Sequence, residues 1–250
     1  MYQNEREMEI QKILVREQYM TVRQLSQLLY TSESSIRRDL SVLEKRGIVK
    51  RSYGGVELAK TNIQVPPFSA RLHDQVREKK IIAEKAASLV NDGDIVFLDQ
   101  SSSAMFVARA IMGKAKVTVV TNNIEILSLL SQTDLEVISS GGTLCKTNRN
   151  CLLGQDAHRI FAEVQANFLF FSTKALSDDG IIYDCNREEV CIRNTMLEHA
   201  EQRVFLCTSE KMGKKLGYRQ CAVNEVDCII TDRNRSEASA ILQDYSGMVL

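Results

Sequence analysis

The chain lacks the sequence features of exported and membrane-embedded proteins. No apolar stretch in its 250 residues approaches the ~20 residues that a membrane-spanning helix needs. Its first residues, Met-Tyr-Gln-Asn-Glu, have neither the basic region nor the apolar run of a secretory signal. We therefore expect a cytoplasmic protein without a signal peptide and without membrane contact.

The chain also lacks recognisable patterns of metal ligands. It has three histidines, isolated from one another, and seven cysteines without a C-x-x-C motif. Cys145 and Cys151 are six residues apart, as are Cys185 and Cys191, and this spacing is typical of no zinc site. Free thiols are the ordinary state of such cysteines in a reducing cytosol. We expect no metal site, no cofactor and no catalytic residue.

Charge is balanced overall but unevenly distributed. The chain has 32 basic and 32 acidic residues, yet residues 1–60 carry 11 basic and 8 acidic residues, a net +3. Residues 34–54 carry six basic and two acidic residues, a net +4. Contacts with phosphate depend on the local field rather than on total charge. The overall neutrality therefore does not exclude a nucleic acid partner.

Residues 21–45 predict two short helices joined by a turn. Thr21 and Gln24 fit a capping box, the chain breaks at Tyr30, and Ser32 can cap the second helix. The expected buried residues are Val22, Leu25, Leu28 and Leu29 in the first helix, and Ile36, Leu40 and Leu43 in the second. The opposite face of the second helix carries Ser34, Arg38, Ser41 and Lys45, with Ser35 and Arg37 on its flanks. This arrangement predicts a helix-turn-helix with a polar, basic recognition helix.

The residues that follow predict a basic hairpin, or wing. Gly47 can end the recognition helix, and residues 48–53 favour a strand that ends at Gly54-Gly55. A solvated basic helix is the plain alternative, but the order of caps, turn, apolar stripe and wing favours DNA. We expect DNA contacts from Ser32, Ser34, Ser35, Arg37 and Arg38 in the major groove, and from Lys50, Arg51 and Tyr53 at phosphates or the minor groove.

Residues 5–57 resemble the N-terminal domain of the DeoR-type bacterial transcription regulators. The pattern that carries the resemblance is Ser32-Glu33-x-x-Ile36-Arg37-Arg38-Asp39-Leu40, then Leu43-Glu44-x-x-Gly47 and Tyr53-Gly54-Gly55. The chain departs from this family at Tyr30, where a Gly or Asn would more easily take the tight turn. The resemblance implies a double-stranded DNA operator as partner.

A second, larger domain follows a stiff connector. The only two prolines are adjacent, Pro66-Pro67, and follow a polar stretch. We expect a DNA-binding domain over 1–57, a linker over 58–67 and an α/β domain over 68–250. A helix is expected over 68–90. Strands are expected at 94–99, 117–120, 135–138, 168–171, 204–207 and 228–231, and helices near 103–111, 124–130, 157–163, 188–200 and 236–243. This alternation predicts a mainly parallel sheet covered on both faces.

Polar residues follow several of these strands, at the edge where ligands bind in parallel sheets near a topological switch point. They are Asp99-Gln100-Ser101-Ser102-Ser103, Thr121-Asn122, Gly141-Gly142, Ser172-Thr173-Lys174 and Lys211. Hydroxyls, amides and two lysines on one rim would suit a phosphorylated polyol. Each element alone has a plainer interpretation as a helix cap, a turn or a solvated lysine, and Asp178-Asp179-Gly180 is expected to be only a hairpin turn.

Residues 68–232 resemble the DeoR-type sensor domain, which is similar in fold to ribose-5-phosphate isomerases and usually senses a sugar phosphate. The motifs that carry this are Pro67-Phe68-x-x-Arg71, Glu78-Lys79, Gly93-Asp94, Asp99, Thr121-Asn122, Gly141-Gly142-Thr143-Leu144, Gly154 and Ser209-x-Lys211. The resemblance implies a pocket formed by Asp99, Gln100, Ser101, Ser102, Ser103, Thr121, Asn122, Gly141, Gly142, Lys174, Glu188, Arg193 and Lys211. The chain departs from the family at Ser101-Ser102-Ser103, which replaces a Gly-Thr-Thr run, and at Arg193 and Thr208, which replace Lys and Asp.

We therefore expect a transcriptional repressor of sugar or carbohydrate genes that acts as a homo-oligomer, a dimer or tetramer, and responds to a phosphorylated sugar. One small domain binds DNA weakly, so paired half-sites about 34 Å apart, or at multiples, are expected. A rival hypothesis is a sugar-phosphate isomerase-like enzyme with an appended helix-turn-helix, using Asp99 or Glu188 as its base. A third is a regulator that has lost its ligand.

Overall fold

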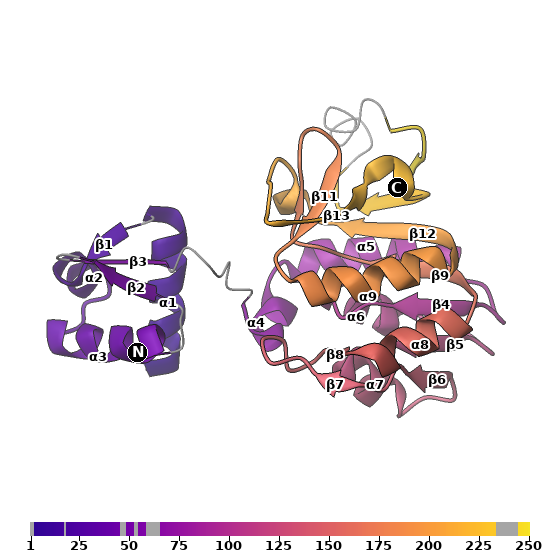
Figure 1. Cartoon of the computed structure of the whole chain (residues 1–250), viewed down its shortest axis with the longest axis horizontal. Coiled ribbons are helices and arrows are strands. Elements are labelled where there is room, and N and C mark those ends of the chain that lie inside the picture. The colour runs from indigo at the N-terminus through magenta and orange to yellow at the C-terminus, as the bar shows by residue number, and fades with distance from the viewer. Residues whose placement is uncertain (1–2, 18, 46–48, 53–54, 59–65, 234–244) are drawn as a thin grey trace. The chain divides into compact units, whose positions relative to one another are not determined.

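The computed structural model describes residues 3–17, 19–45, 49–52, 55–58, 66–233 and 245–250. The chain divides into two compact units, Met1–Val65 and Pro66–Leu250 (Figure 1). Most of the expected linker, residues 59–65, lies outside the described residues. No helix in the described ranges is long and apolar enough to cross a membrane.

The N-terminal unit is a winged helix-turn-helix. It consists of α1 (Gln3–Glu17), β1 (Tyr19–Thr21), α2 (Val22–Leu28), α3 (Glu33–Lys45), β2 (Val49–Ser52) and β3 (Gly55–Leu58). The three strands form an antiparallel sheet in the order β1-β3-β2. Its core includes Leu25, Ile36, Leu40, Leu43, Val49 and Val56. Ile10 and Leu14 of α1, a helix outside the predicted motif, complete this core. The predicted winged helix-turn-helix is confirmed.

The predicted caps of this unit are confirmed. The backbone N–H of Thr21 donates to the side-chain oxygen of Gln24 at 2.9 Å, and that of Gln24 donates to the Thr21 hydroxyl at 3.2 Å. Ser32 accepts from the N–H of Ser35 at 3.3 Å, at the start of α3. These side chains satisfy backbone groups that the first turn of each helix leaves unpaired.

The prediction that Leu28 is buried is wrong. Leu28 is 52% exposed, whereas Leu25 and the C-cap residue Leu29 face the core. The stripe of α3 is buried as expected. Gly47, where we expected the recognition helix to end, lies outside the described residues, as do Tyr53 and Gly54 of the expected wing.

The C-terminal unit is built on a seven-stranded sheet in which every pairing is parallel. Its order is β15-β14-β12-β9-β4-β5-β6. The strands are β4 (Ile95–Leu98), β5 (Thr118–Thr121), β6 (Glu136–Ser139), β9 (Ala166–Phe171), β12 (Ala200–Cys207), β14 (Cys228–Thr231) and β15 (Met248–Val249). The six predicted strands are confirmed.

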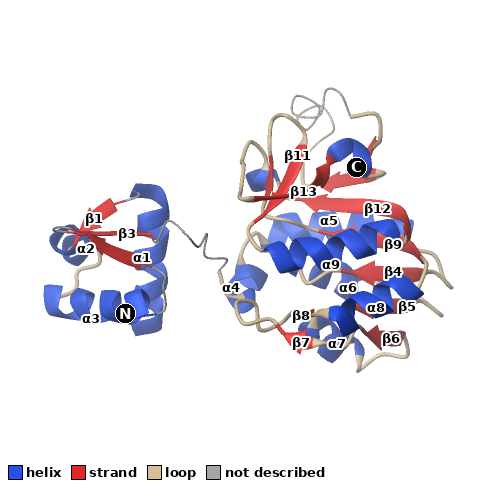
Figure 2. Cartoon of the chain, viewed as in Figure 1, coloured by secondary structure: helices blue, strands red, loops and turns tan. Residues whose placement is uncertain are grey.

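Helices cover both faces of this sheet (Figure 2). The first face packs against α5 (Val76–Leu89), α6 (Ser102–Ala110) and α7 (Ile124–Leu130), and the second against α8 (Gln155–Glu163) and α9 (Arg187–Glu198). In β4, Val96 and Leu98 belong to the first layer and Phe97 to the second, where its ring lies 5.1 Å from that of Phe161. This alternation follows from the two-residue period of a strand. The predicted α/β fold is confirmed.

The helix expected over 68–90 is broken. It forms α4 (Phe68–His73) and then α5, because Gln75 adopts a left-handed conformation with φ 48°. The buried ammonium of Lys79 donates to the carbonyls of Arg71 and Asp74, each at 2.6 Å, and so joins the two helices across the break. Local sequence periodicity does not show such a break.

Short antiparallel elements extend the α/β unit. One small sheet contains β10 (Ala175–Leu176), β11 (Ile181–Asp184) and β13 (Tyr218–Ala222), and β7 (Thr143–Leu144) pairs with β8 (Leu152–Leu153). Two short 3-10 helices, η1 (Ser209–Lys211) and η2 (Val223–Glu225), follow β12 and β13. Gly180, with φ 74°, turns the chain between β10 and β11, which confirms the expected hairpin turn. The helix expected at 236–243 lies outside the described residues.

Candidate functional sites

The α/β unit has a topological switch point between β4 and β9. From β4 the chain proceeds to β5 and β6 on one side, then returns to β9, β12 and β14 on the other. Asp99 and Ser172 directly follow the last residues of these two strands, β4 and β9. The N–H of Ser172 donates to Asp99 Oδ2 at 3.2 Å, and that of Ser101 donates to Asp99 Oδ1 at 3.0 Å. The crevice at such a point is the usual ligand site of an open α/β sheet.

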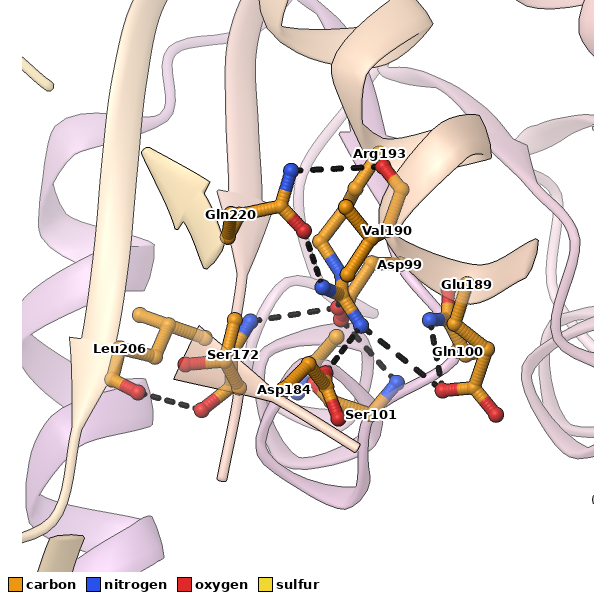
Figure 3. A network of polar contacts seen from close by, with 12 residues as sticks. Asp99, Gln100, Ser101, Ser172, Asp184, Glu189, Val190, Arg193, Leu206 and Gln220 are labelled. Atoms are coloured by element: carbon orange, nitrogen blue, oxygen red, sulfur yellow. Dashed lines mark hydrogen bonds and ion pairs between the residues drawn. The ribbon is translucent and has the colours of Figure 1, made fainter. Parts of the chain in front are cut away.

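A buried arginine connects this point with three other elements (Figure 3). Arg193 of α9 is 1% exposed. Its Nε donates to Asp99 Oδ2 at 3.1 Å, one Nη donates to Asp184 Oδ2 at 2.7 Å, and the other donates to Gln220 Oε1 at 2.5 Å. The guanidinium fork suits this set because it presents several donors in one plane.

Within this network, the charges of Arg193 and Asp184 stabilise one another, whereas burial outweighs Arg193 at Asp99 and raises the pKa of that carboxyl. Burial disfavours the charged form of Arg193, but Asp184, Asp99 and Glu189 outweigh it and raise the pKa of the guanidinium. Burial also opposes ionisation of Asp184, yet Arg193 and then Lys174 outweigh it and lower the pKa of that carboxyl. The pair is therefore charged at neutral pH.

A row of amides extends the network toward β5. Gln100 donates to Glu189 Oε2 at 2.9 Å, and Asn148 donates to Glu189 Oε1 at 3.2 Å. Asn122 donates to Gln100 Oε1 at 3.4 Å. Glu189 is 8% exposed and takes the inward position that we expected for Glu188, whose side chain is exposed. Asn186 caps α9 and so fixes which of the two acids faces inward.

Cationic side chains face the same region. Lys211 donates to the Ser172 hydroxyl at 2.5 Å. Lys174 is half-buried as a residue, and its ammonium has no hydrogen bond or ion pair within the described ranges. Burial, and then the charge of Arg71, lowers the pKa of Lys174 from 10.5 to about 7. Burial, and then the charge of Lys211, lowers the pKa of Lys79 to about 8. Burial also lowers the pKa values of Lys211 and Arg71. Cations that are costly to charge suit an anionic partner.

Four buried polar atoms near these strand ends have no hydrogen-bond partner in the described structure. They are Ser103 Oγ, Asn122 Oδ1, Asn123 Nδ2 and Thr208 Oγ1. Ser103 stands in the first turn of α6, a helix that Ser101 caps by accepting from the Ala104 N–H at 3.0 Å. Buried polar groups are normally paired, so these atoms indicate room for a polar ligand or water.

Other predicted pocket residues have different surroundings. The Thr121 hydroxyl donates to the Leu98 carbonyl at 2.7 Å and so links β5 to β4, while Ser102 is buried in α6. Gly141 and Gly142 follow β6, are exposed, and make no hydrogen bond with the described residues of the Arg193 network. A Cβ on Gly142 would lie 2.4 Å from the Leu153 carbonyl oxygen, so this glycine permits a close backbone approach.

Sequence reasoning missed several members of the network. Asp184, Glu189 and Gln220 contact Arg193, and Asn148 contacts Glu189. Asp184 and Gln220 belong to the short antiparallel strands, which carry no strong pattern. Among described residues, no group of three or more His, Cys, Asp and Glu side chains is arranged to hold a metal ion.

The recognition helix presents the expected polar face. Ser34 and Arg38 are exposed, and Arg38 has no hydrogen bond or ion pair with other residues that the structure describes. Arg37 is exposed as well but pairs with Glu33 at 2.9 Å, one turn earlier. Ser35 is half-buried beside the Ser32 hydroxyl.

The two wing cations differ. Lys50 is exposed on β2. Arg51 lies against α3 instead, where it donates to the Arg37 carbonyl at 2.8 Å and the Ser41 hydroxyl at 2.5 Å, and pairs with Glu44 at 3.2 Å. Tyr53 lies outside the described residues.

A winged helix-turn-helix followed by an α/β unit with a polar switch point defines the class of two-domain transcription regulators. Residues 6–62 match the DeoR-like helix-turn-helix domain, and residues 74–233 match the DeoR C terminal sensor domain. The chain therefore belongs to the DeoR family of helix-turn-helix transcription regulators, and its N-terminal unit is the DNA-binding domain.

Similar proteins span almost the whole chain. The HTH-type transcriptional repressor GlcR of Bacillus subtilis (strain 168) is 31% identical over 251 residues, covering 100% of this chain and 96% of that protein. The Glycerol-3-phosphate regulon repressor of Escherichia coli (strain K12) is 24% identical over 233 residues, covering 93% and 92%. A solved structure, ribose 5 phosphate isomerase A from Neisseria gonorrhoeae, aligns with a TM-score of 0.41 at 18% identity, covering 56% of this chain and 54% of that chain.

Proposed function

We propose that this protein is a cytoplasmic repressor of sugar or carbohydrate genes whose affinity for its operator is set by a phosphorylated sugar. The observation that carries the proposal is the group of cations beside the switch point. Lys174, Lys211 and Arg71 have lowered pKa values there, so a bound anion would relieve an unfavourable electrostatic environment.

The chemistry of the site suggests which ligand groups meet which side chains. A phosphate would bind near Lys174 and Lys211, which supply positive charge. Hydroxyl groups of the sugar would donate to Asn122 Oδ1 and exchange a hydrogen bond with Ser103 Oγ, two buried atoms without partners in the described structure. One molecule that carries both a phosphate and hydroxyls satisfies both needs.

The names of two relatives support the proposed role. One is a repressor, and the other is a repressor of a glycerol-3-phosphate regulon, which concerns a phosphorylated polyol. We propose a homo-oligomer, a dimer or tetramer, that engages paired half-sites of a double-stranded operator. The ligand changes DNA binding only if it binds the operator-competent and incompetent states with different affinities.

A gel shift with DNA from upstream of the protein's own gene and of its neighbours tests the proposal. Hexose, pentose and ketose phosphates are titrated into the complex, with the unphosphorylated sugars as matched controls. A specific shift that one phosphate alters, and its parent sugar does not, supports both parts. A shift that no phosphate alters removes the sensing role and favours a regulator that has lost its ligand.

The same panel separates the regulator from the rival enzyme. Each phosphate that binds in a thermal shift assay is incubated with the protein and followed by NMR. Binding without turnover supports the regulator. Turnover of a pentose or hexose phosphate, together with no DNA shift at low salt, would overturn the proposal in favour of the isomerase-like enzyme.

A further inference from the structure

Tyr30 occupies a backbone position that favours glycine. It has φ 48° and follows the last turn of α2. The N–H of Thr31 donates to the Ser26 carbonyl at 3.1 Å, and that of Tyr30 donates to the Gln27 carbonyl at 3.4 Å. These two bonds form a Schellman motif with Tyr30 at its left-handed residue. A bulky side chain there is unusual, because its Cβ crowds the backbone.

The rest of the turn holds this conformation in place. The Ser26 hydroxyl donates to the Thr31 carbonyl at 2.6 Å, and the Thr31 hydroxyl donates to the Leu29 carbonyl at 3.0 Å. The turn therefore has enough hydrogen bonds of its own, and the tyrosine side chain is not needed to stabilise it.

Packing does not explain the tyrosine either. Tyr30 is 97% exposed, and its hydroxyl has no hydrogen bond with any residue in the described part of the chain. A glycine or asparagine would take this conformation at lower cost, and because Tyr30 is almost fully exposed, the exchange would lose almost no buried surface. A residue that destabilises the fold and makes no compensating contact within it indicates a binding role.

The position of Tyr30 identifies what it binds. It lies two residues before Ser32, the cap of the recognition helix α3. The N-terminal residues of a recognition helix enter the major groove, and phosphates line the edge of that groove. A phenol next to this helix end has the reach of a long side chain and a hydroxyl that donates to phosphate oxygen.

We propose that Tyr30 contacts DNA. Its hydroxyl donates to a backbone phosphate at the edge of the groove that receives α3, and its ring packs on the adjoining deoxyribose. The net +4 of residues 34–54 favours a phosphate partner over another protein. The inference rests on the DNA-binding role of the N-terminal unit and is independent of the ligand of the α/β unit.

Two variants of Tyr30 and one matched control test the proposal. Tyr30→Phe removes the hydroxyl, Tyr30→Asn removes the ring and tolerates the left-handed turn, and Tyr218→Phe changes an exposed tyrosine of the α/β unit. Binding to a fluorescein-labelled duplex of random sequence is measured by anisotropy over a range of salt concentrations. The upstream fragment that gives a gel shift is measured in parallel.

We expect Tyr30→Phe to bind both DNAs about tenfold more weakly, the loss of one hydrogen bond to a charged group. The slope of log K against log salt should stay unchanged, because a neutral donor releases no counterion. Tyr30→Asn should lose at least as much affinity while its melting temperature rises by a few degrees. Tyr218→Phe should bind as the parent does.

Three results would overturn the proposal. Parental affinity in both Tyr30 variants would show that the side chain does not touch DNA. Affinity and melting temperature that fall together in Tyr30→Asn would show that the tyrosine acts through the fold. A smaller oligomer in sedimentation of either variant would show that the Tyr30 ring contacts a second copy of the chain. If the parental protein binds the random duplex but no upstream fragment, the proposed operator is refuted. The test of Tyr30 on the random duplex then still applies.

Discussion

Arg193 Nε lies 3.1 Å from Asp99 Oδ2, although 94 positions separate the two residues and neither side chain is more than 1% exposed. The contact fixes α9 to the end of β4, where the sheet changes direction. The same guanidinium contacts Asp184 of β11 and approaches Glu189 to 3.7 Å. One buried cation thus balances carboxylates from three segments of the α/β unit.

Removal of this cation should destabilise the α/β unit strongly. We expect Arg193→Met to lower the free energy of unfolding by about 3–5 kcal/mol, because it leaves buried carboxylates without their partner. Urea denaturation followed by circular dichroism measures the change. Arg159→Met is the matched control, since that arginine is 67% exposed and pairs with Glu163 at 3.8 Å. It should cost about 1 kcal/mol at most, and equal losses in the two variants would refute the role of Arg193.

Ligand binding should depend on pH through Lys174. Its pKa is about 7 in the free protein, and a bound phosphate would raise it. Affinity should therefore fall as the pH rises above 7, because binding must then supply a proton to Lys174. Affinity should also fall below pH ~6, where a phosphate monoester loses its second charge. We expect a maximum near pH 7 in isothermal titrations with the sugar phosphate that gives the largest thermal shift.

Lys174→Arg distinguishes this residue from its cationic neighbours. An arginine keeps its proton throughout this range, so the variant should lose most of the alkaline decline. Titrations at pH 8 in two buffers of different ionisation enthalpy count the protons taken up. The parent should take up nearly one proton at Lys174 and the variant clearly fewer. The same uptake in both proteins would exclude Lys174 from the phosphate site.

The sequence predicted the elements of this protein better than the orientation of single side chains. The alternating apolar runs indicated six strands of the parallel sheet, since periodicity reports burial on both faces. Periodicity did not separate Glu188 from Glu189, because both suit the first turn of a helix. The phase set by the Asn186 cap decides between them. The break at Gln75 and the exposure of Leu28 depend in the same way on tertiary contacts.

In the wing, the sequence likewise did not distinguish the orientations of two adjacent cations, Lys50 and Arg51. Both were expected at phosphates or the minor groove, yet Arg51 contacts Ser41 and Glu44 of α3, and Lys50 is exposed. We expect Lys50→Met to weaken binding to all DNA and to reduce the salt slope by about one unit. Arg51→Met should weaken binding through the position of the wing, with the slope unchanged. Anisotropy over a salt series measures both. A slope reduced by one unit in Arg51→Met would show that Arg51 does contact a phosphate.

Arg38 should act on specificity rather than on charge alone. It is exposed on α3 and, unlike Arg37 with its partner Glu33, has no ion pair within the described residues. An arginine that is free in this way can present both its donors to guanine O6 and N7. We expect Arg38→Ala to lose ~1–3 kcal/mol of operator binding and to relax base preference at one position. Selection of bound sequences from a randomised operator pool detects that change. Arg109→Ala, on α6 of the α/β unit, is the control and should keep the parental preference. A uniform loss of affinity across the pool, with base preferences intact, would instead assign Arg38 to the phosphate backbone.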